Sequence, residues 1–252
     1  MTKAELFDIL EAKYTYYNQP AFIPPDPIVI PHQFLRKQDI EISGFLSATI
    51  AWGNRKSIVG NARRLVQWMD NSPYDFLLCA KPQDFKPFLH FVHRTFNGDD
   101  CLFFLTALQR IYIKYQGLEP LFSELNEKGP AIAINGFREV FLSTDHLKRS
   151  EKHIANPLAG SAGKRINMFL RWMVRKDQHG VDFGIWHSID QANLVCPLDI
   201  HSGRVARKLG LLHRRQNDWK ATIELTEALK VFDPSDPVKY DFALFGMGVH
   251  GY

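Results

Sequence analysis

Apolar residues recur at intervals of three and four positions along most of this chain, and this spacing places them on one face of an α-helix. Leu6, Ile9 and Leu10 show it within residues 3–16, and residues 54–70 repeat it. No stretch alternates apolar and polar residues in the manner of a half-buried β-strand, so we do not expect a large sheet. The pattern predicts an all-α protein.

Prolines and glycines divide this pattern into short segments. Five prolines fall within residues 19–31, and we predict an extended connector there because proline cannot donate the hydrogen bond that a helix interior requires. The expected helices cover residues 3–16, 39–52, 54–70, 73–79, 82–95, 99–115, 118–127, 132–147, 164–176, 182–192, 200–211, 217–231 and 236–246.

The composition is that of an ordinary globular protein. Its 252 residues are 45% hydrophobic and 23% charged, which suits one large domain or two lobes. No apolar run approaches the length of a membrane span, and the N-terminal residues lack the apolar core of a signal peptide. The three cysteines are far apart, which argues against a disulfide framework, a zinc site or an iron–sulfur cluster. We expect a soluble, monomeric, cytoplasmic protein without a bound metal.

Positive charge is concentrated in one part of the sequence. The total formal charge is +4, but residues 148–220 contain fourteen Lys and Arg against six Asp and Glu, so this part carries +8 and the remainder −4. A basic region on a slightly acidic body is typical of proteins that bind polyanions. A solvated helical surface would carry the same charge, so both interpretations stay open at this point.

A glycine-containing turn precedes the most basic predicted helix. Residues 157–176 read PLAGSAGKRINMFLRWMVRK, in which small residues occupy 159–163 and Lys164 begins the helix. Gly160 and Gly163 allow positive φ angles and a close approach of a partner to the backbone. The N–H groups at such a helix start bind anions, typically phosphate. An ordinary turn between helices is the alternative interpretation.

An aspartate marks the start of a second basic helix. Residues 197–211 read PLDIHSGRVARKLGL, and Asp199 lies where a helix N-cap carboxylate would accept the first free N–H groups. A capping role alone would explain this residue. The same predicted helix carries Arg204, Arg207 and Lys208.

Together these segments resemble the helix-hairpin-helix DNA glycosylases, the superfamily of endonuclease III. Leu-Ala-Gly-Ser-Ala-Gly-Lys at 158–164 is similar to the family signature L-P-G-V-G-x-K, and the segment at 198–211 is similar to V-D-T-H-V-x-R…R-L-G-L. Phe45-Leu46-Ser47-Ala48 with the helix that follows is similar to L-L-S-x-Q…L. The small-residue end at 243–251 resembles the end of the last core helix.

The sequence also departs from the common pattern of this family. Ala159 and Ala162 replace the usual proline and second glycine of the hairpin. Lys164 and Asp199 are 35 positions apart, a longer gap than in the endonuclease III type, and no cysteine cluster follows the core. The long gap resembles the archaeal 8-oxoguanine glycosylase branch, and the chain looks similar to an uncharacterised bacterial family related to that branch.

The resemblance implies both a fold and an activity. The fold would be an all-α, two-lobed glycosylase fold with DNA in the cleft, one lobe spanning 40–147 and the other combining 1–39 with 148–252. The activity would be base-excision repair of damaged duplex DNA, as a glycosylase and AP lyase that removes an oxidised purine, most simply 8-oxoguanine. The target base would first be flipped out of the stack. Lys164 would then attack C1′ and form a Schiff base, while Asp199 stabilises positive charge on the sugar.

The resemblance also assigns residues to DNA binding. The hairpin at 157–164 would contact phosphates, and a side chain between Thr49 and Trp52 would fill the gap left by the flipped base, with indole able to stack on bases. The hairpin could also hold a monovalent cation through its carbonyl groups. The expected DNA-binding residues are Gly160, Ser161, Ala162, Gly163, Arg165, Arg204, Thr49 and Trp52, with further phosphate contacts from Arg171, Arg175 and Arg207.

Two other functions fit the same residues. A non-catalytic DNA-binding protein would keep the hairpin without the chemistry, although phosphate binding by itself needs neither Lys164 nor Asp199. An RNA-directed or structure-specific nucleic-acid enzyme on the same scaffold is the second alternative, and the sequence does not separate it from the glycosylase.

Overall fold

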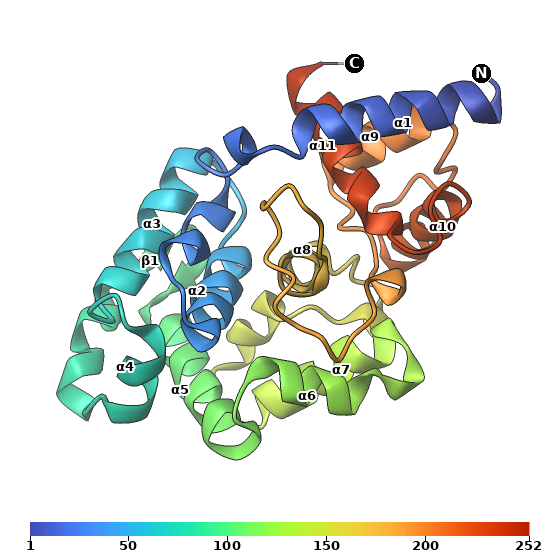
Figure 1. Cartoon of the computed structure of the whole chain (residues 1–252). Helices are drawn as coiled ribbons and strands as arrows, with labels where there is room; N and C mark the ends of the chain where they lie inside the picture. The colour runs from blue at the N-terminus through green and yellow to red at the C-terminus, as the bar shows by residue number, and fades with distance from the viewer. Residues whose placement is uncertain (252) are drawn as a thin grey trace. The chain divides into compact units, whose positions relative to one another are not determined.

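The computed structural model of the protein describes residues 1–251, and α-helices account for most of it (Figure 1). Within this range the only named strands are β1 (Val92–His93) and β2 (Phe96–Asn97), which form one short antiparallel pair. The prediction of a mostly helical protein is therefore confirmed.

The chain divides into two compact units. Unit 1 comprises Met1–Phe22 and Asn156–Tyr252, and unit 2 comprises Ile23–Ala155. The sequence led us to expect boundaries after residues 39 and 147, whereas the structure assigns residues 23–39 and 148–155 to the other unit. Each unit carries a formal charge of +2, fifteen cations against thirteen anions in unit 1 and sixteen against fourteen in unit 2. The basic region of the sequence is thus balanced by acids that folding brings into the same unit.

Unit 1 is built around a close contact between its last helix and two others. Helix α11 packs against both α1 and α9. A Cβ added at Gly246 would lie 2.3 Å from the ring of Tyr17, and one at Gly248 would lie 2.8 Å from the backbone of His201, so only glycine permits these approaches. The helices of unit 1 are α1 (Lys3–Tyr17), α8 (Lys164–Val174), α9 (Ile200–Lys208), α10 (Trp219–Lys230) and α11 (Tyr240–His250).

Unit 2 surrounds a central helix, α2, that is apolar or small along nearly all of its length. Every residue of α2 from position 39 to 49 is buried, as its sequence DIEISGFLSAT predicts. Helix α5 packs against α4, α6 and α7. The helices of unit 2 are α2 (Lys37–Thr49), α3 (Arg55–Gln67), α4 (Pro73–Cys79), α5 (Gly98–Tyr115), α6 (Leu118–Leu125) and α7 (Pro130–Leu142).

Two predicted helices are wrong. Residues 82–95 form a 3₁₀ helix, η4 (Pro82–His90), followed by the β1–β2 hairpin, because Pro87 lies inside the segment and interrupts an α-helix. Residues 182–192 are irregular apart from a single 3₁₀ turn. Their backbone closes the end of α8, since the N–H groups of Phe183 and Trp186 donate to the carbonyls of Trp172 and Met173 at 2.8 and 2.9 Å.

The connector at 19–31 also differs from the prediction. Instead of an extended strand it forms short 3₁₀ turns, η1 (Pro20–Phe22), η2 (Pro27–Val29) and η3 (Pro31–Gln33). Proline is well suited to the first position of such a turn, where its missing N–H costs nothing. The Asp26 side chain caps η2 by accepting a hydrogen bond from Ile28 at 3.1 Å.

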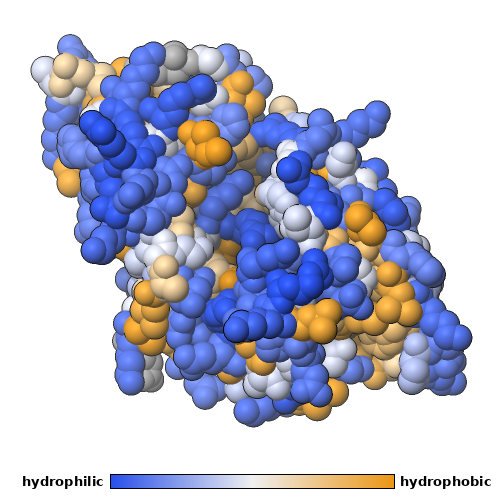
Figure 2. Space-filling view, turned by 180° about the vertical axis from the view of Figure 1, so that it is seen from behind, coloured by the Kyte–Doolittle hydropathy of each residue, from blue (hydrophilic) through white to orange (hydrophobic). Residues whose placement is uncertain are grey.

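The surface is mainly hydrophilic on the face that Figure 2 shows, and its apolar side chains are scattered in small groups. Among residues 1–251, no helix is both long and apolar enough to cross a membrane.

Candidate functional site

The predicted hairpin forms a compact turn before α8. A 3₁₀ helix, η7 (Pro157–Ala159), is capped by the Asn156 side chain, which accepts a hydrogen bond from the Ala159 N–H at 2.9 Å. Gly160 and Gly163 both adopt left-handed backbone conformations, with φ of 92° and 63°. Such φ values favour glycine. The two glycines therefore allow the turn to form although Ala159 and Ala162 replace the usual proline and second glycine.

Most polar backbone groups of this turn bond within the chain. The N–H groups of Gly160 and Ser161 donate to carbonyls, and that of Gly163 donates to the Ser161 hydroxyl at 3.3 Å. Ser161 also forms an isolated antiparallel β-bridge with Asp218, which turns the Ala162 N–H toward the chain at Asn217. An anion at this turn would therefore meet the open N–H groups of the first turn of α8.

Three of the four carbonyl groups of the turn accept hydrogen bonds within the chain. The Gly160 carbonyl accepts a hydrogen bond from the Trp219 N–H at 3.1 Å, and the Gly163 carbonyl accepts one from Asn167 N–H. The Ala162 carbonyl accepts from the side chains of Asn167 and Thr222, each at 3.3 Å. The contacts with Trp219 and Thr222 join the turn to the start of α10, whereas the Asn167 N–H belongs to the first turn of α8 itself.

Asp199 caps helix α9 with one of its two carboxylate oxygens. Its Oδ1 accepts a hydrogen bond from the Ser202 N–H at 2.8 Å and one from the Ser202 hydroxyl at 3.0 Å. The Ser202 hydroxyl in turn accepts from the Asp199 N–H at 3.0 Å. This reciprocal pair fixes the carboxylate and leaves Oδ2 directed elsewhere.

The second oxygen of Asp199 faces Lys164. The Lys164 Nζ lies 3.7 Å from Asp199 Oδ2, although the two residues are 35 positions apart in the sequence. The Lys164 side chain is 30% exposed and that of Asp199 is 15% exposed, so the pair is partly shielded yet accessible. Folding thus places an amine and a carboxylate, each at the first turn of a helix, beside the glycine turn.

A buried aspartate on α11 belongs to the same electrostatic cluster. Asp241 is buried and accepts a hydrogen bond from Arg171. Burial raises its pKa to about 7; Arg171 and Lys164 oppose this increase, whereas Asp199 and Asp182 add to it. Asp241 is not among the site residues predicted from the sequence. The available signal was a single carboxylate within the otherwise apolar segment YDFALFGMGV.

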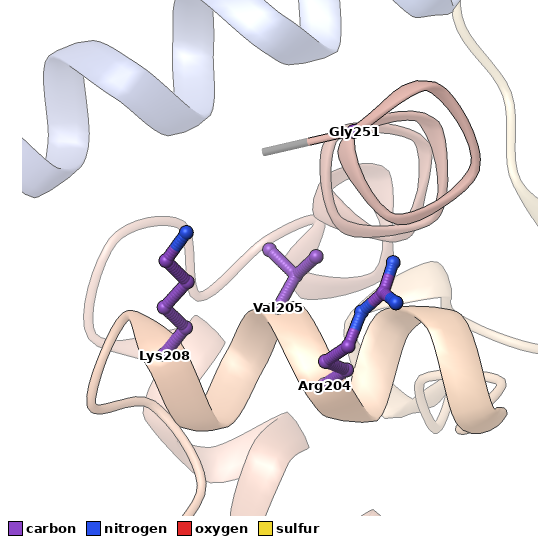
Figure 3. A pocket seen from close by; sticks show the side chains of 4 residues that line it. All are labelled: Arg204, Val205, Lys208 and Gly251. Carbon is purple, nitrogen blue, oxygen red and sulfur yellow. The ribbon is translucent and has the colours of Figure 1, made fainter.

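Arg165 and Arg204 are positioned differently. Arg165 is half-buried, and burial lowers the pKa of its guanidinium to about 10, so it remains charged at neutral pH. Arg204 is exposed and donates to the Gly248 carbonyl at 2.7 Å. Together with Val205, Lys208 and Gly251 it lines a pocket of about 330 Å³. In Figure 3, Arg204 and Lys208 rise from the same face of α9, on either side of Val205.

Three arginines expected at the DNA surface have other roles. Arg171 and Arg175 are 3% and 0% exposed, so the prediction that they contact phosphates is wrong. Arg175 donates to Asp177, Asp182 and Asp236 at distances of 2.7 to 3.1 Å. Arg207 donates to the backbone carbonyls of the loop at 214–215 and orders that loop.

The two wedge candidates lie in unit 2. Thr49 is buried in the last turn of α2, whereas Trp52 is half-buried. The Trp52 ring stacks on His153, with centroids 5.8 Å apart, and meets the edge of His93 at 5.0 Å. Of the two side chains, Trp52 is the one with an exposed portion.

No group of three or more His, Cys, Asp or Glu side chains within residues 1–251 is arranged to hold a metal ion. Both ring nitrogens of His93 have partners within the chain, the Trp52 carbonyl at 3.0 Å and the Asn61 side chain at 2.8 Å.

Comparison with known proteins places the chain in one family. No curated protein and no solved structure matches it. A family model described as a protein of unknown function, DUF2400, matches residues 26–250. Because this match covers nearly the whole sequence, the chain belongs to the DUF2400 family.

Proposed function

We propose that the protein is a DNA base-excision repair glycosylase with AP-lyase activity, which removes an oxidised purine such as 8-oxoguanine from duplex DNA. The observation that carries this proposal is the approach of the Lys164 amine to the Asp199 carboxylate, 3.7 Å apart, beside the glycine turn. The resemblance to the helix-hairpin-helix glycosylases supplies the class of substrate.

Lys164 is the nucleophile in this proposal. Its neutral amine attacks C1′ of the flipped nucleotide, so that an N–C1′ bond forms and the bond to the damaged base breaks. The sugar ring opens to a protonated Schiff base, and loss of a proton from C2′ expels the 3′ phosphate. Asp199 Oδ2 accepts the proton that the lysine loses and passes it to the departing base. As a carboxylate again, Asp199 then offsets the positive charge of the Schiff base.

The cap on α9 supports this division of roles. Oδ1 of Asp199 is held by the N–H and hydroxyl of Ser202, so the carboxylate cannot rotate freely away from Lys164. A group fixed in this way loses little entropy when the substrate arrives. The open N–H groups of the first turn of α8 would hold a backbone phosphate next to the amine.

Strand nicking by single-residue variants tests the proposal. We expect a duplex with one 8-oxoguanine to be nicked by the wild-type protein. Lys164→Gln should lower the rate at least about a hundredfold, as expected when a nucleophile is removed. Asp199→Asn is the second variant, because Asn caps a helix as well as Asp does and the substitution removes only the negative charge. It should also slow nicking without lowering the melting temperature.

Lys176→Gln provides the matched control. It removes an exposed lysine just beyond the other end of α8 and should leave the nicking rate unchanged. If Lys164→Gln nicks at the wild-type rate, Lys164 is not the nucleophile. If no variant nicks and all bind the duplex equally well, the non-catalytic DNA-binding alternative takes the place of this proposal.

A further inference from the structure

Helix α3 concentrates positive charge in unit 2. Its sequence RKSIVGNARRLVQ contains four cations and no acid. The buried residues Ile58, Ala62, Leu65 and Val66 hold one side of the helix against the unit. Lys56, Arg63 and Arg64 lie on the opposite side and are exposed; we refer to these three as the basic face of α3.

The basic face is not neutralised within the chain. Elsewhere in unit 2, Arg36, Arg138 and Arg149 form ion pairs with Asp75, Glu151 and Asp100 at 2.8 to 2.9 Å. Among the side chains that the structure describes, no acid forms an ion pair with any member of the basic face. Arg64 donates to the Asn61 side-chain oxygen and lies over the Trp68 ring. Positive charge that folding leaves unpaired is available to a partner.

A glycine opens the centre of this surface. Gly60 lies between Lys56 and Arg63 on the same side of the helix, and a Cβ at this position would meet no atom within 4 Å. Glycine in a helix interior costs about 0.5–1 kcal/mol relative to alanine. No packing contact in the unit requires this glycine, whereas its missing side chain lets an extended partner approach the helix backbone between the cations.

The β1–β2 hairpin adds one more cation next to the basic face, near the beginning of α3. Arg94 occupies the turn of the β1–β2 hairpin with φ of 55°, a conformation that arginine rarely adopts. Its side chain lies against Gly53, with Arg94 Nη1 3.1 Å from the position of an added Cβ. His93 fixes the hairpin to this end of the helix through Asn61 and the Trp52 carbonyl.

We propose that the basic face of α3, together with Arg94, binds the phosphate backbone of a nucleic acid, as a second binding surface in addition to the glycine turn. The helix rises about 10.5 Å from Lys56 to Arg63, which is close to three base-pair rises of about 3.4 Å along the axis of a DNA duplex. Three of the four cations are arginines, whose planar fork suits phosphate. The identification of the polyanion as DNA rests on the proposed function.

The salt dependence of binding to a short undamaged duplex tests this surface. Each phosphate contact contributes roughly 0.9 to the slope of log affinity against log salt. The variant Lys56→Ser/Arg63→Ser/Arg64→Ser should therefore lose about 2 to 3 from the slope and bind roughly tenfold more weakly or worse at moderate salt. A control with the same loss of charge, Lys86→Ser/Lys114→Ser/Lys128→Ser, removes three other exposed lysines of unit 2 and should keep the wild-type slope.

A second pair of variants avoids any loss of stability. Gly60→Glu and Gly60→Gln place side chains of nearly equal size in open space, and both should stabilise the helix. Both side chains obstruct the approach to the backbone to a similar extent, but only the glutamate introduces negative charge, so Gly60→Glu should bind the duplex severalfold more weakly than Gly60→Gln. Equal binding by Gly60→Glu and Gly60→Gln, together with an unchanged slope for the triple variant, would overturn the proposal.

Failure of this surface can be distinguished from failure of the catalytic proposal. The triple variant keeps Lys164 and Asp199, so at saturating duplex it should nick DNA as the wild type does. If the salt slope of the triple variant falls but no form of the protein nicks DNA, the binding surface is supported and the glycosylase proposal is wrong. If nicking depends on Lys164 but the salt slope of the triple variant is unchanged, the glycosylase proposal is supported and the binding surface is wrong.

Discussion

Helices α8 and α3 are both amphipathic and both rich in arginine, but they use it in opposite ways. In α8, Arg171 is buried against Asp182 and Asp241. Arg175, just past the end of the same helix, is fully buried among aspartates. In α3, Arg63 and Arg64 are exposed and pair with no acid among residues 1–251. The first set stabilises the fold of unit 1, and the second remains available to a partner.

The difference arises from residues far away in the sequence. Asp236 is 61 positions from Arg175, and Asp241 is 70 positions from Arg171. Nothing in the local sequence of α8 indicates that these acids will be brought to it. A count of basic residues therefore overestimates the binding surface of unit 1 and overlooks the one on α3, which lies outside the basic region at 148–220.

The largest expected effect comes from breaking the buried cluster of unit 1. Arg175→Met leaves Asp182 and Asp236 without the cation that faces them, and loss of one partner of a buried ion pair typically costs about 3–5 kcal/mol. Arg63→Met, on the basic face of α3, should change the free energy of unfolding by no more than about 0.5 kcal/mol. Denaturant unfolding of the two variants measures both values, and similar losses would contradict the comparison.

A smaller effect should appear in the pH dependence of stability. The unfolded chain loses the Asp241 proton near the ordinary pKa of 3.8, whereas burial delays this loss in the folded protein to about pH 7. Stability should therefore fall as the pH rises through this window, by an amount on the order of a few kcal/mol. Asp241→Asn removes this titration, so its stability should vary less with pH. Parallel pH profiles for wild type and variant would show that another group is responsible.

Glycine replacements in the two helices should act in opposite directions. Gly163 begins α8 with φ of 63°, so Gly163→Ala should destabilise the protein by roughly 1–2 kcal/mol. Gly60→Ala removes a helix-interior glycine that no atom contacts and should stabilise it by about 0.5–1 kcal/mol. Melting temperatures that shift in opposite directions would support the comparison, and shifts of the same sign would oppose it.

The sequence predicted a helix well where residues within or next to that helix determine its ends. The helix at 73–79 was predicted with both ends correct, because Pro73 marks its first position and the chain turns extended after Cys79. Residues 82–95 have apolar residues at helical spacing, yet Pro87 and the contacts of the hairpin decide their structure. Residues 182–192 are held by the end of α8, a tertiary contact that has no local signature.

The candidate site was predictable to a similar extent. The positions of Lys164 and Asp199 followed from two local motifs, and the approach of their side chains is what those motifs together imply. Asp241 was missed because its role depends on Arg171, on a different helix. The occupied carbonyls of the glycine turn were missed because the donors on Trp219 and Thr222 come from α10.

Covalent trapping of a reaction intermediate would identify the nucleophile of the proposed reaction. The protein is incubated with a duplex that carries an abasic site, or one that carries 8-oxoguanine, in the presence of borohydride, which reduces a Schiff base to a stable protein–DNA adduct. Digestion and mass spectrometry then identify the attached residue. We predict an adduct with both duplexes, attached at Lys164 and absent from Lys164→Gln. An adduct on another residue, or none with either duplex while binding is intact, would contradict the account.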